Sequence, residues 1–136
     1  MNLTKYKDFL VIIAVYALAY FSILLNDGFF WDGWVISNSS PEQLIQIFKD
    51  NGNYWYGYFF ALIKNLGGVI FLSRLITFLS YLVIGLIFYQ ILKKYTFALS
   101  NFSLIITLYF VTFPVNFARI TVMNTPYAIC LLLFAV

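Results

Sequence analysis

Two carboxylates and two arginines are the residues of this chain whose types suggest chemistry. Asp27 and Asp32 lie in the stretch NDGFFWDGW, among large aromatic side chains, and Arg74 and Arg119 follow farther along the chain. A carboxylate can accept the proton of an attacking hydroxyl group or help to hold a divalent metal. The guanidinium group of arginine is a planar fork that matches the oxygens of a phosphate. These residue types therefore suit group transfer from a phosphate-bearing donor.

The composition indicates where such chemistry would take place. Hydrophobic residues make up 63% of the 136 residues and charged residues only 10%, whereas soluble proteins have about 25% charged residues. The chain is therefore expected to be an integral membrane protein with the lipid bilayer as its surroundings. Eight basic residues stand against five acidic ones, a small excess that indicates membrane topology and not a nucleic-acid partner.

The residue inventory also limits the mechanisms that are open to the chain. It contains no histidine, so proton transfer would depend on carboxylates, and the commonest metal ligand is missing. Cys130 is the single cysteine, which excludes a disulfide within the chain. The carboxylates leave a divalent metal as an option, and the cofactor is otherwise unknown.

The lengths of the apolar runs predict an all-α fold, a polytopic transmembrane helical bundle that forms one domain. A helix needs about 20 residues to cross the hydrocarbon core. The runs predict spans at about 9–26, 69–92 and 99–113 and an incomplete span at 126–136, with an outer loop at about 27–68. Because the last run is about half the length of a span, we expect the chain to be the N-terminal part of a larger bundle.

The outer loop contains two patterns that are typical of short interfacial helices. Ser40 and Gln43 have the spacing of a capping box, and Gly52 is placed to end the helix that they begin. The apolar run 54–66 is followed by Gly67. Both helices are too short to cross a membrane. We expect the first to lie on the membrane surface, either as a packed surface helix without further role or as the lining of a substrate cleft, and the second to be interfacial or half-inserted.

The basic residues predict how the chain is oriented in the membrane. Lys5 and Lys7 precede the first apolar run, and Lys93 and Lys94 end the second long one. Since lysine favours the cytoplasmic side, the N-terminus is expected in the cytoplasm and the acidic loop outside, in a bacterial inner membrane. An alternative is that the first run is a secretory signal peptide, because an Ala-x-Ala triplet occurs at 17–19.

Four stretches occur in an order that is found in one family of membrane enzymes. They are NDGFFWDGW, YFFALIKNLGG, SRLITFLSYLVIGLIFYQILKK and FPVNFARITVMNTPYAICLLL. In this order the chain resembles the GT-C superfamily of glycosyltransferases, including its protein mannosyltransferase-like and aminoarabinose transferase-like members. The resemblance covers nearly the whole chain and depends on the order and texture of the segments.

The resemblance implies a specific activity. Enzymes of this family move a sugar from a polyprenyl-phosphate or polyprenyl-diphosphate carrier to an acceptor hydroxyl on the outer face of the membrane. By position, Asp32 matches the acidic motif best, as catalytic base or metal-associated carboxylate, and Asp27 is second. Arg74 and Arg119 are implied as contacts of the donor phosphate. Many relatives have two adjacent acidic residues, whereas a glycine follows each aspartate here, so the need for a metal stays open.

Two other functional classes fit the same residues. The first is a non-catalytic small membrane subunit or flippase-like partner in envelope polysaccharide assembly, which would have another membrane protein as its partner. The second is a transporter, whose spans should carry ionisable groups near the bilayer midplane. Arg74 is the residue that comes nearest to this pattern.

Overall fold

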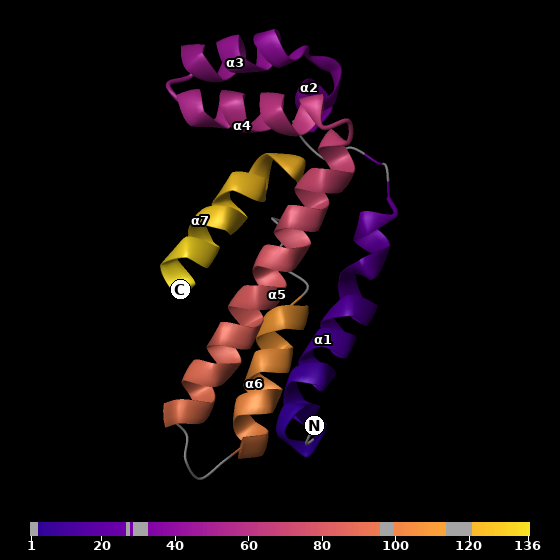
Figure 1. The fold of residues 1–136 in the computed structure, drawn as a ribbon, viewed down its shortest axis with the longest axis vertical. Coiled ribbons are helices and arrows are strands. Elements are labelled where there is room, and N and C mark those ends of the chain that lie inside the picture. The colour runs from indigo at the N-terminus through magenta and orange to yellow at the C-terminus, as the bar shows by residue number, and fades with distance from the viewer. Residues whose placement is uncertain (1–2, 27, 29–32, 96–99, 114–120) are drawn as a thin grey trace.

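The computed structural model describes residues 3–26, 28, 33–95, 100–113 and 121–136. Every element in these ranges is helical, and no strand occurs within them. In chain order the helices are α1 (Leu3–Leu24), α2 (Gly33–Asn38), α3 (Pro41–Asp50), α4 (Tyr54–Asn65), α5 (Val69–Tyr95), α6 (Ser100–Thr112), the 3₁₀ turn η2 (Val122–Asn124) and α7 (Thr125–Ala135). Figure 1 shows α1, α5, α6 and α7 along the long axis of the molecule, with α2, α3 and α4 gathered at one end.

Two of the described helices are long and apolar enough to cross a membrane. They are the stretch Tyr6–Leu24 of α1, with a mean hydropathy of 1.9, and α5, with a mean hydropathy of 2.2. The 27 residues of α5 rise about 40 Å, more than the hydrocarbon core requires. Helices α6 and α7 have 13 and 11 residues, which is short of the about 20 that a crossing needs. Length and composition thus support two spans.

Local sequence explains the two helices of the predicted outer loop. The capping box of α3 is confirmed: Gln43 N donates to Ser40 Oγ at 3.2 Å, and Ser40 N donates to Gln43 Oε1 at 2.7 Å. Helices α3 and α4 are each followed by a glycine with positive φ, Gly52 at 76° and Gly67 at 86°. Glycine adopts this left-handed conformation without the steric cost that other residues pay. The predicted helix stops are therefore present.

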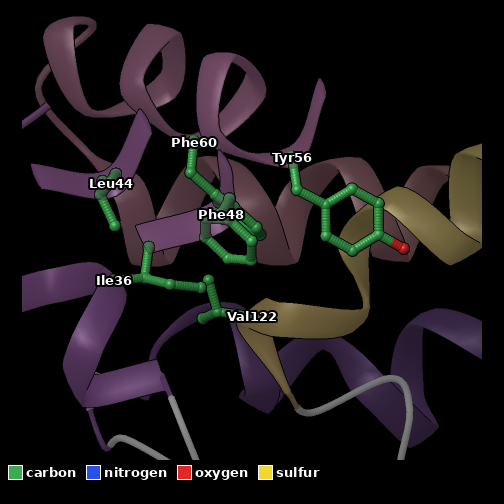
Figure 2. Packing of buried hydrophobic residues seen from close by; sticks show 6 residues of the cluster. All are labelled: Ile36, Leu44, Phe48, Tyr56, Phe60 and Val122. Carbon is green, nitrogen blue, oxygen red and sulfur yellow. The ribbon is translucent and has the colours of Figure 1, made fainter. Parts of the chain in front are cut away.

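The apolar face of α3 is covered by protein, which the sequence did not predict. Leu44 and Phe48 are buried, and α4 lies so close to α3 that a Cβ atom on Gly57 would come within 2.8 Å of Ile45 Cα. Figure 2 shows the resulting cluster, to which α2 and η2 contribute Ile36 and Val122. The apolar face of α3 is therefore packed against α4 and is not exposed for contact with a membrane. Helix α2 was not predicted either.

Tyrosines and a glycine join the long helices. Tyr16 donates to the carbonyl oxygen of Phe78 on α5 at 3.1 Å. Tyr20 donates at 3.1 Å to the carbonyl oxygen of Phe113, just after α6. Between α5 and α6 the side chain of Val111 packs directly on the backbone of Gly85, where an added Cβ atom would lie 2.3 Å from Val111 Cγ1. A small residue at such a contact is typical of helix packing in membranes.

A polar cluster closes the end of the molecule that lies opposite α3 and α4. Tyr89 donates a hydrogen bond to Asp8 Oδ2, and Lys93 Nζ lies 3.6 Å from the same carboxylate oxygen. Asp8 is near the start of α1, and Lys93 is near the end of α5. The start of α1 and the basic end of α5 therefore lie at the same end of the molecule, as Figure 1 shows.

Candidate functional site

Arg74 is the predicted site residue that the structure describes, and it is almost fully buried. It lies near the start of α5 with 2% of its surface exposed. Nη1 donates to the carbonyl oxygen of Ile23 at 3.5 Å, and Nη2 donates to the carbonyl oxygen of Gly28. Ile23 belongs to the last turn of α1, whose carbonyl groups lack partners within the helix. A cation placed there also interacts favourably with the helix dipole.

The acceptors of Arg74 lie on the chain that leaves α1. We call residues 23–28 the exit turn, of which Asp27 is outside the described residues. The side chain of Asn26 accepts a hydrogen bond from Gly28 N at 2.7 Å, and a Cβ atom on Gly28 would come within 2.9 Å of that side-chain oxygen. The exit turn is therefore tight, and Arg74 holds it from the inside.

A small cavity lies beside the guanidinium group, between α1 and α5. It is lined by Tyr16, Tyr20, Ile23, Arg74 and Phe78. Its free volume, about 10 Å³, is close to what one water molecule requires. A phosphate group is larger than this. The described conformation thus gives Arg74 backbone acceptors and room for a water-sized neighbour.

Three predicted site residues, Asp27, Asp32 and Arg119, lie outside the described residues. Their nearest described neighbours in the chain are at the same end of the molecule. Gly28, next to Asp27, accepts a hydrogen bond from Arg74, and Gly33, next to Asp32, is buried at the start of α2. Thr121, two residues after Arg119, is buried, and the next residue, Val122, belongs to the buried cluster that includes Ile36 and Tyr56. The flanking segments therefore converge where α2–α4 meet the start of α5.

Lys64, at the same end of the molecule, positions α2, a role that the sequence did not predict. Its Nζ donates to the carbonyl oxygens of Ile36 at 3.4 Å, of Ser37 at 2.6 Å and of Ser39. These carbonyl groups lie at and just beyond the end of α2, where a helix leaves its acceptors without partners. Because α2 begins directly after Asp32, Lys64 fixes the helix that follows the acidic stretch.

Buried hydroxyl groups join α7 to α5. Thr125 Oγ1 accepts a hydrogen bond from Thr77 Oγ1 at 3.1 Å, and its single hydrogen is shared between the carbonyl oxygens of Val122 at 2.8 Å and Ser73 at 3.2 Å. All four residues are buried. Neutral hydrogen bonds of this kind hold helices together without a charge in the apolar interior. Because Ser73 precedes Arg74 directly in the chain, these hydrogen bonds also fix the position of α7 relative to Arg74.

Tyr56 occupies the contact between α4 and α7. Its ring meets the ring of Tyr127 edge-on, with centroids 5.7 Å apart. Burial first, and then the hydrogen bond with Tyr127, raises the pKa of Tyr56 well above its ordinary value of 10.0. This phenol therefore stays protonated at neutral pH.

The described residues contain no group of three or more His, Cys, Asp or Glu side chains that could hold a metal ion. Asp27 and Asp32 are not among the residues to which this statement applies. In the described ranges the acidic residues at this end are Glu42 and Asp50, both exposed on α3. The carboxylate chemistry predicted for Asp27 and Asp32 therefore stays a prediction.

Comparison with known proteins found no match for this chain: no family model, no curated protein and no solved structure is similar to it. The chemistry and placement of its own residues therefore carry the functional proposal.

Proposed function

We propose that this chain is a polytopic membrane glycosyltransferase that moves a sugar from a polyprenyl-phosphate carrier to an acceptor hydroxyl. The reaction takes place on the outer face of a bacterial inner membrane, and the N-terminus is cytoplasmic. Asp32 is the catalytic base, and Asp27 is the second candidate. Arg74 and Arg119 serve the donor phosphate, and a divalent metal is an option that the two carboxylates leave open.

The observation that carries this proposal is the hold of Arg74 on the exit turn. A buried arginine in an apolar helix is costly unless it has acceptors, and here the acceptors lie on both sides of Asp27 in the chain. Lys64 holds the helix after Asp32 in a similar way. Two cations from different helices thus order the segments that flank the acidic stretch. The cost of burying these charged side chains is expected where the position of a carboxylate is important for function.

The proposed step is a direct displacement at the anomeric carbon. The acceptor oxygen attacks that carbon while its proton passes to the Asp32 carboxylate. The bond between the carbon and the phosphate oxygen breaks, and the polyprenyl phosphate leaves with the electron pair. The configuration at the carbon is inverted. In this scheme Arg74 contributes first by positioning Asp27, and direct contact with the phosphate requires its guanidinium to release Gly28.

The test of the base is the Asp32→Asn variant of the full chain in proteoliposomes. We expect sugar transfer to fall by at least about 100-fold, the usual range for loss of a general base, while membrane insertion is unchanged. Glu42→Gln on the exposed face of α3 is the matched control and should keep wild-type transfer. Wild-type turnover in Asp32→Asn would remove this assignment.

The test of Arg74 compares Arg74→Ala with Arg74→Lys. Arg74→Ala should weaken transfer and donor binding more than it lowers the yield of inserted protein. Arg74→Lys keeps the charge but loses the fork, so it should recover only part of the activity. Equal donor affinity in all three proteins would leave Arg74 with a purely structural part.

One observation favours a second candidate, a non-catalytic subunit or flippase-like partner in envelope polysaccharide assembly. The cavity beside Arg74 has room for about one water molecule, and backbone oxygens already occupy the guanidinium. A panel of polyprenyl-linked sugars separates the two candidates. Turnover of any member supports the enzyme, whereas no turnover together with stable copurification of another membrane protein supports the subunit.

A further inference from the structure

One side of α4 is an exposed stripe of large aromatic and aliphatic side chains. Tyr54, Tyr58, Leu62 and Leu66 recur at every fourth position, and Trp55 lies beside them. Their exposed fractions lie between 48% and 68%. Residues spaced by four positions share one face of a helix. We call this set the α4 stripe.

The other sides of α4 are already used within the protein. Tyr56, Phe60 and Ile63 are buried, and Gly57 touches the backbone of α3. The outward face of α3 is polar, since Glu42, Gln46, Lys49 and Asp50 are all exposed. The unit formed by α3 and α4 therefore has a hydrophilic surface on α3 and an apolar, aromatic surface on α4. Large exposed apolar surfaces of this kind mark a site of interaction.

The place of α4 in the chain indicates what the stripe meets. Leu66, the last member of the stripe, is separated from the first residue of α5 by Gly67 and Gly68 alone. Helix α5 is the most apolar of the candidate spans, and Figure 1 shows α4 lying across its end. The stripe therefore sits at the level where a spanning helix leaves the hydrocarbon. Tyrosine and tryptophan are enriched at that level because their rings are amphipathic.

We propose that the α4 stripe inserts into the interfacial layer of the bilayer, in the leaflet at the start of α5, and that α3 faces water above it. The occupant of this surface is lipid at the boundary between head groups and acyl chains. This arrangement would hold α2 at a fixed height above the membrane. The inference requires α5 to span the bilayer and does not depend on which reaction the protein performs.

Spin-label accessibility tests the proposal directly. Single cysteines are introduced at Leu62 and Tyr58 on the stripe and at Gln46 and Lys49 on α3, in the full chain with Cys130→Ala. Each protein is labelled and reconstituted at low density in phosphatidylcholine and phosphatidylglycerol vesicles. Oxygen, which concentrates in lipid, should relax the stripe labels more than a water-soluble nickel complex does. The α3 labels should show the reverse order.

Two results would overturn the proposal, and they differ from each other. Equal access of the nickel complex to Leu62 and Gln46 would place the stripe in water. Exclusion of both reagents from Leu62 would show that protein covers it, either a second copy or another chain. Circular dichroism of each labelled protein controls for folding, and the exposed positions tolerate a label. Trp55 in a Trp31→Phe, Trp34→Phe background gives a second reading: lipids brominated near the head group should quench it more than lipids brominated deep in the chain.

Discussion

Gly57→Ala should disrupt the contact between α3 and α4 although it replaces a residue with a better helix former. An added Cβ would lie 2.8 Å from Ile45 Cα, 3.1 Å from Leu44 O and 3.2 Å from Ile45 O, whereas ordinary contact begins at 3.4 Å. All three neighbours are backbone atoms, so α3 itself must move by about 0.6 Å, the shortfall at the closest contact. Overpacking costs about 1–3 kcal/mol. Because backbone cannot rotate away, we expect the upper end of this range.

The helix propensity of alanine offsets about 1 kcal/mol of that cost. The net loss in the free energy of unfolding should therefore be about 2 kcal/mol. Equilibrium unfolding of the full chain in detergent micelles, followed by circular dichroism, measures it. A Gly57→Ala protein as stable as the wild type would refute the reasoning, because the close contact would then cost no more than the about 1 kcal/mol gained in helix propensity.

A matched control uses Gly85, where an added Cβ atom would meet a side chain and not the backbone. At Gly85 the added Cβ would lie 2.3 Å from Val111 Cγ1, a side-chain atom. Val111→Ala removes that atom, so Gly85→Ala and Val111→Ala should couple favourably by about 0.5–3 kcal/mol in a double-mutant cycle. Ile45→Ala leaves the Cα in place and should not rescue Gly57→Ala. Rescue at Gly57 would show that the clash lies in a side chain.

Three further predictions concern polar contacts. Lys64→Met should cost about 1.5–3 kcal/mol, the range for hydrogen bonds to a charged group, and should expose amide hydrogens of α2 to faster exchange. Asp8→Asn should cost less than about 1 kcal/mol, since the side chains of Asp8 and Lys93 are 33% and 50% exposed, and the loss should shrink when unfolding is repeated at high salt. Backbone hydrogen bonding and then the Ser40 hydroxyl lower the pKa of Glu42 below its ordinary value of 4.5. The ionised Glu42 therefore stabilises the fold fully above pH 4.5, and this stabilisation is lost as the pH falls through the lower pKa of the folded state. A Glu42→Gln protein should lack this part of the decrease in the free energy of unfolding when stability is measured as a function of pH.

Local features of the fold were predictable from the sequence because the interacting residues are near one another in the chain. Ser40 and Gln43 are three positions apart, and Gly52 and Gly67 act within their own turns. Helix α2 was missed because it has six residues and is held from outside by Lys64. That contact joins residues 25 to 28 positions apart, a separation that no helical or strand period describes.

The contacts of Arg74 at the candidate site could not be predicted from the sequence. The sequence places Arg74 near one end of a span, where a lipid head group or a donor phosphate would be the expected partner. The structure instead gives it carbonyl acceptors 46 and 51 positions earlier in the chain. Main-chain acceptors leave no trace in residue type, so no pattern could have indicated them. The roles of Asp27, Asp32 and Arg119 stay predictions, since these residues lie outside the described ranges.

The hold of Arg74 on the exit turn has a consequence for how this segment can diverge among related chains. The guanidinium group contacts Ile23 and Gly28 through their main-chain oxygens, so these two hydrogen bonds do not depend on the side chains at those positions. A substitution at Ile23 is thus tolerated more readily than a change in the number of residues. One inserted residue displaces the chain by up to about 3.5 Å, which is more than a hydrogen bond allows. Natural variation should therefore preserve the spacing between Ile23 and Gly28, and it should keep Gly28 small because an added Cβ atom there would lie 2.9 Å from the Asn26 side-chain oxygen.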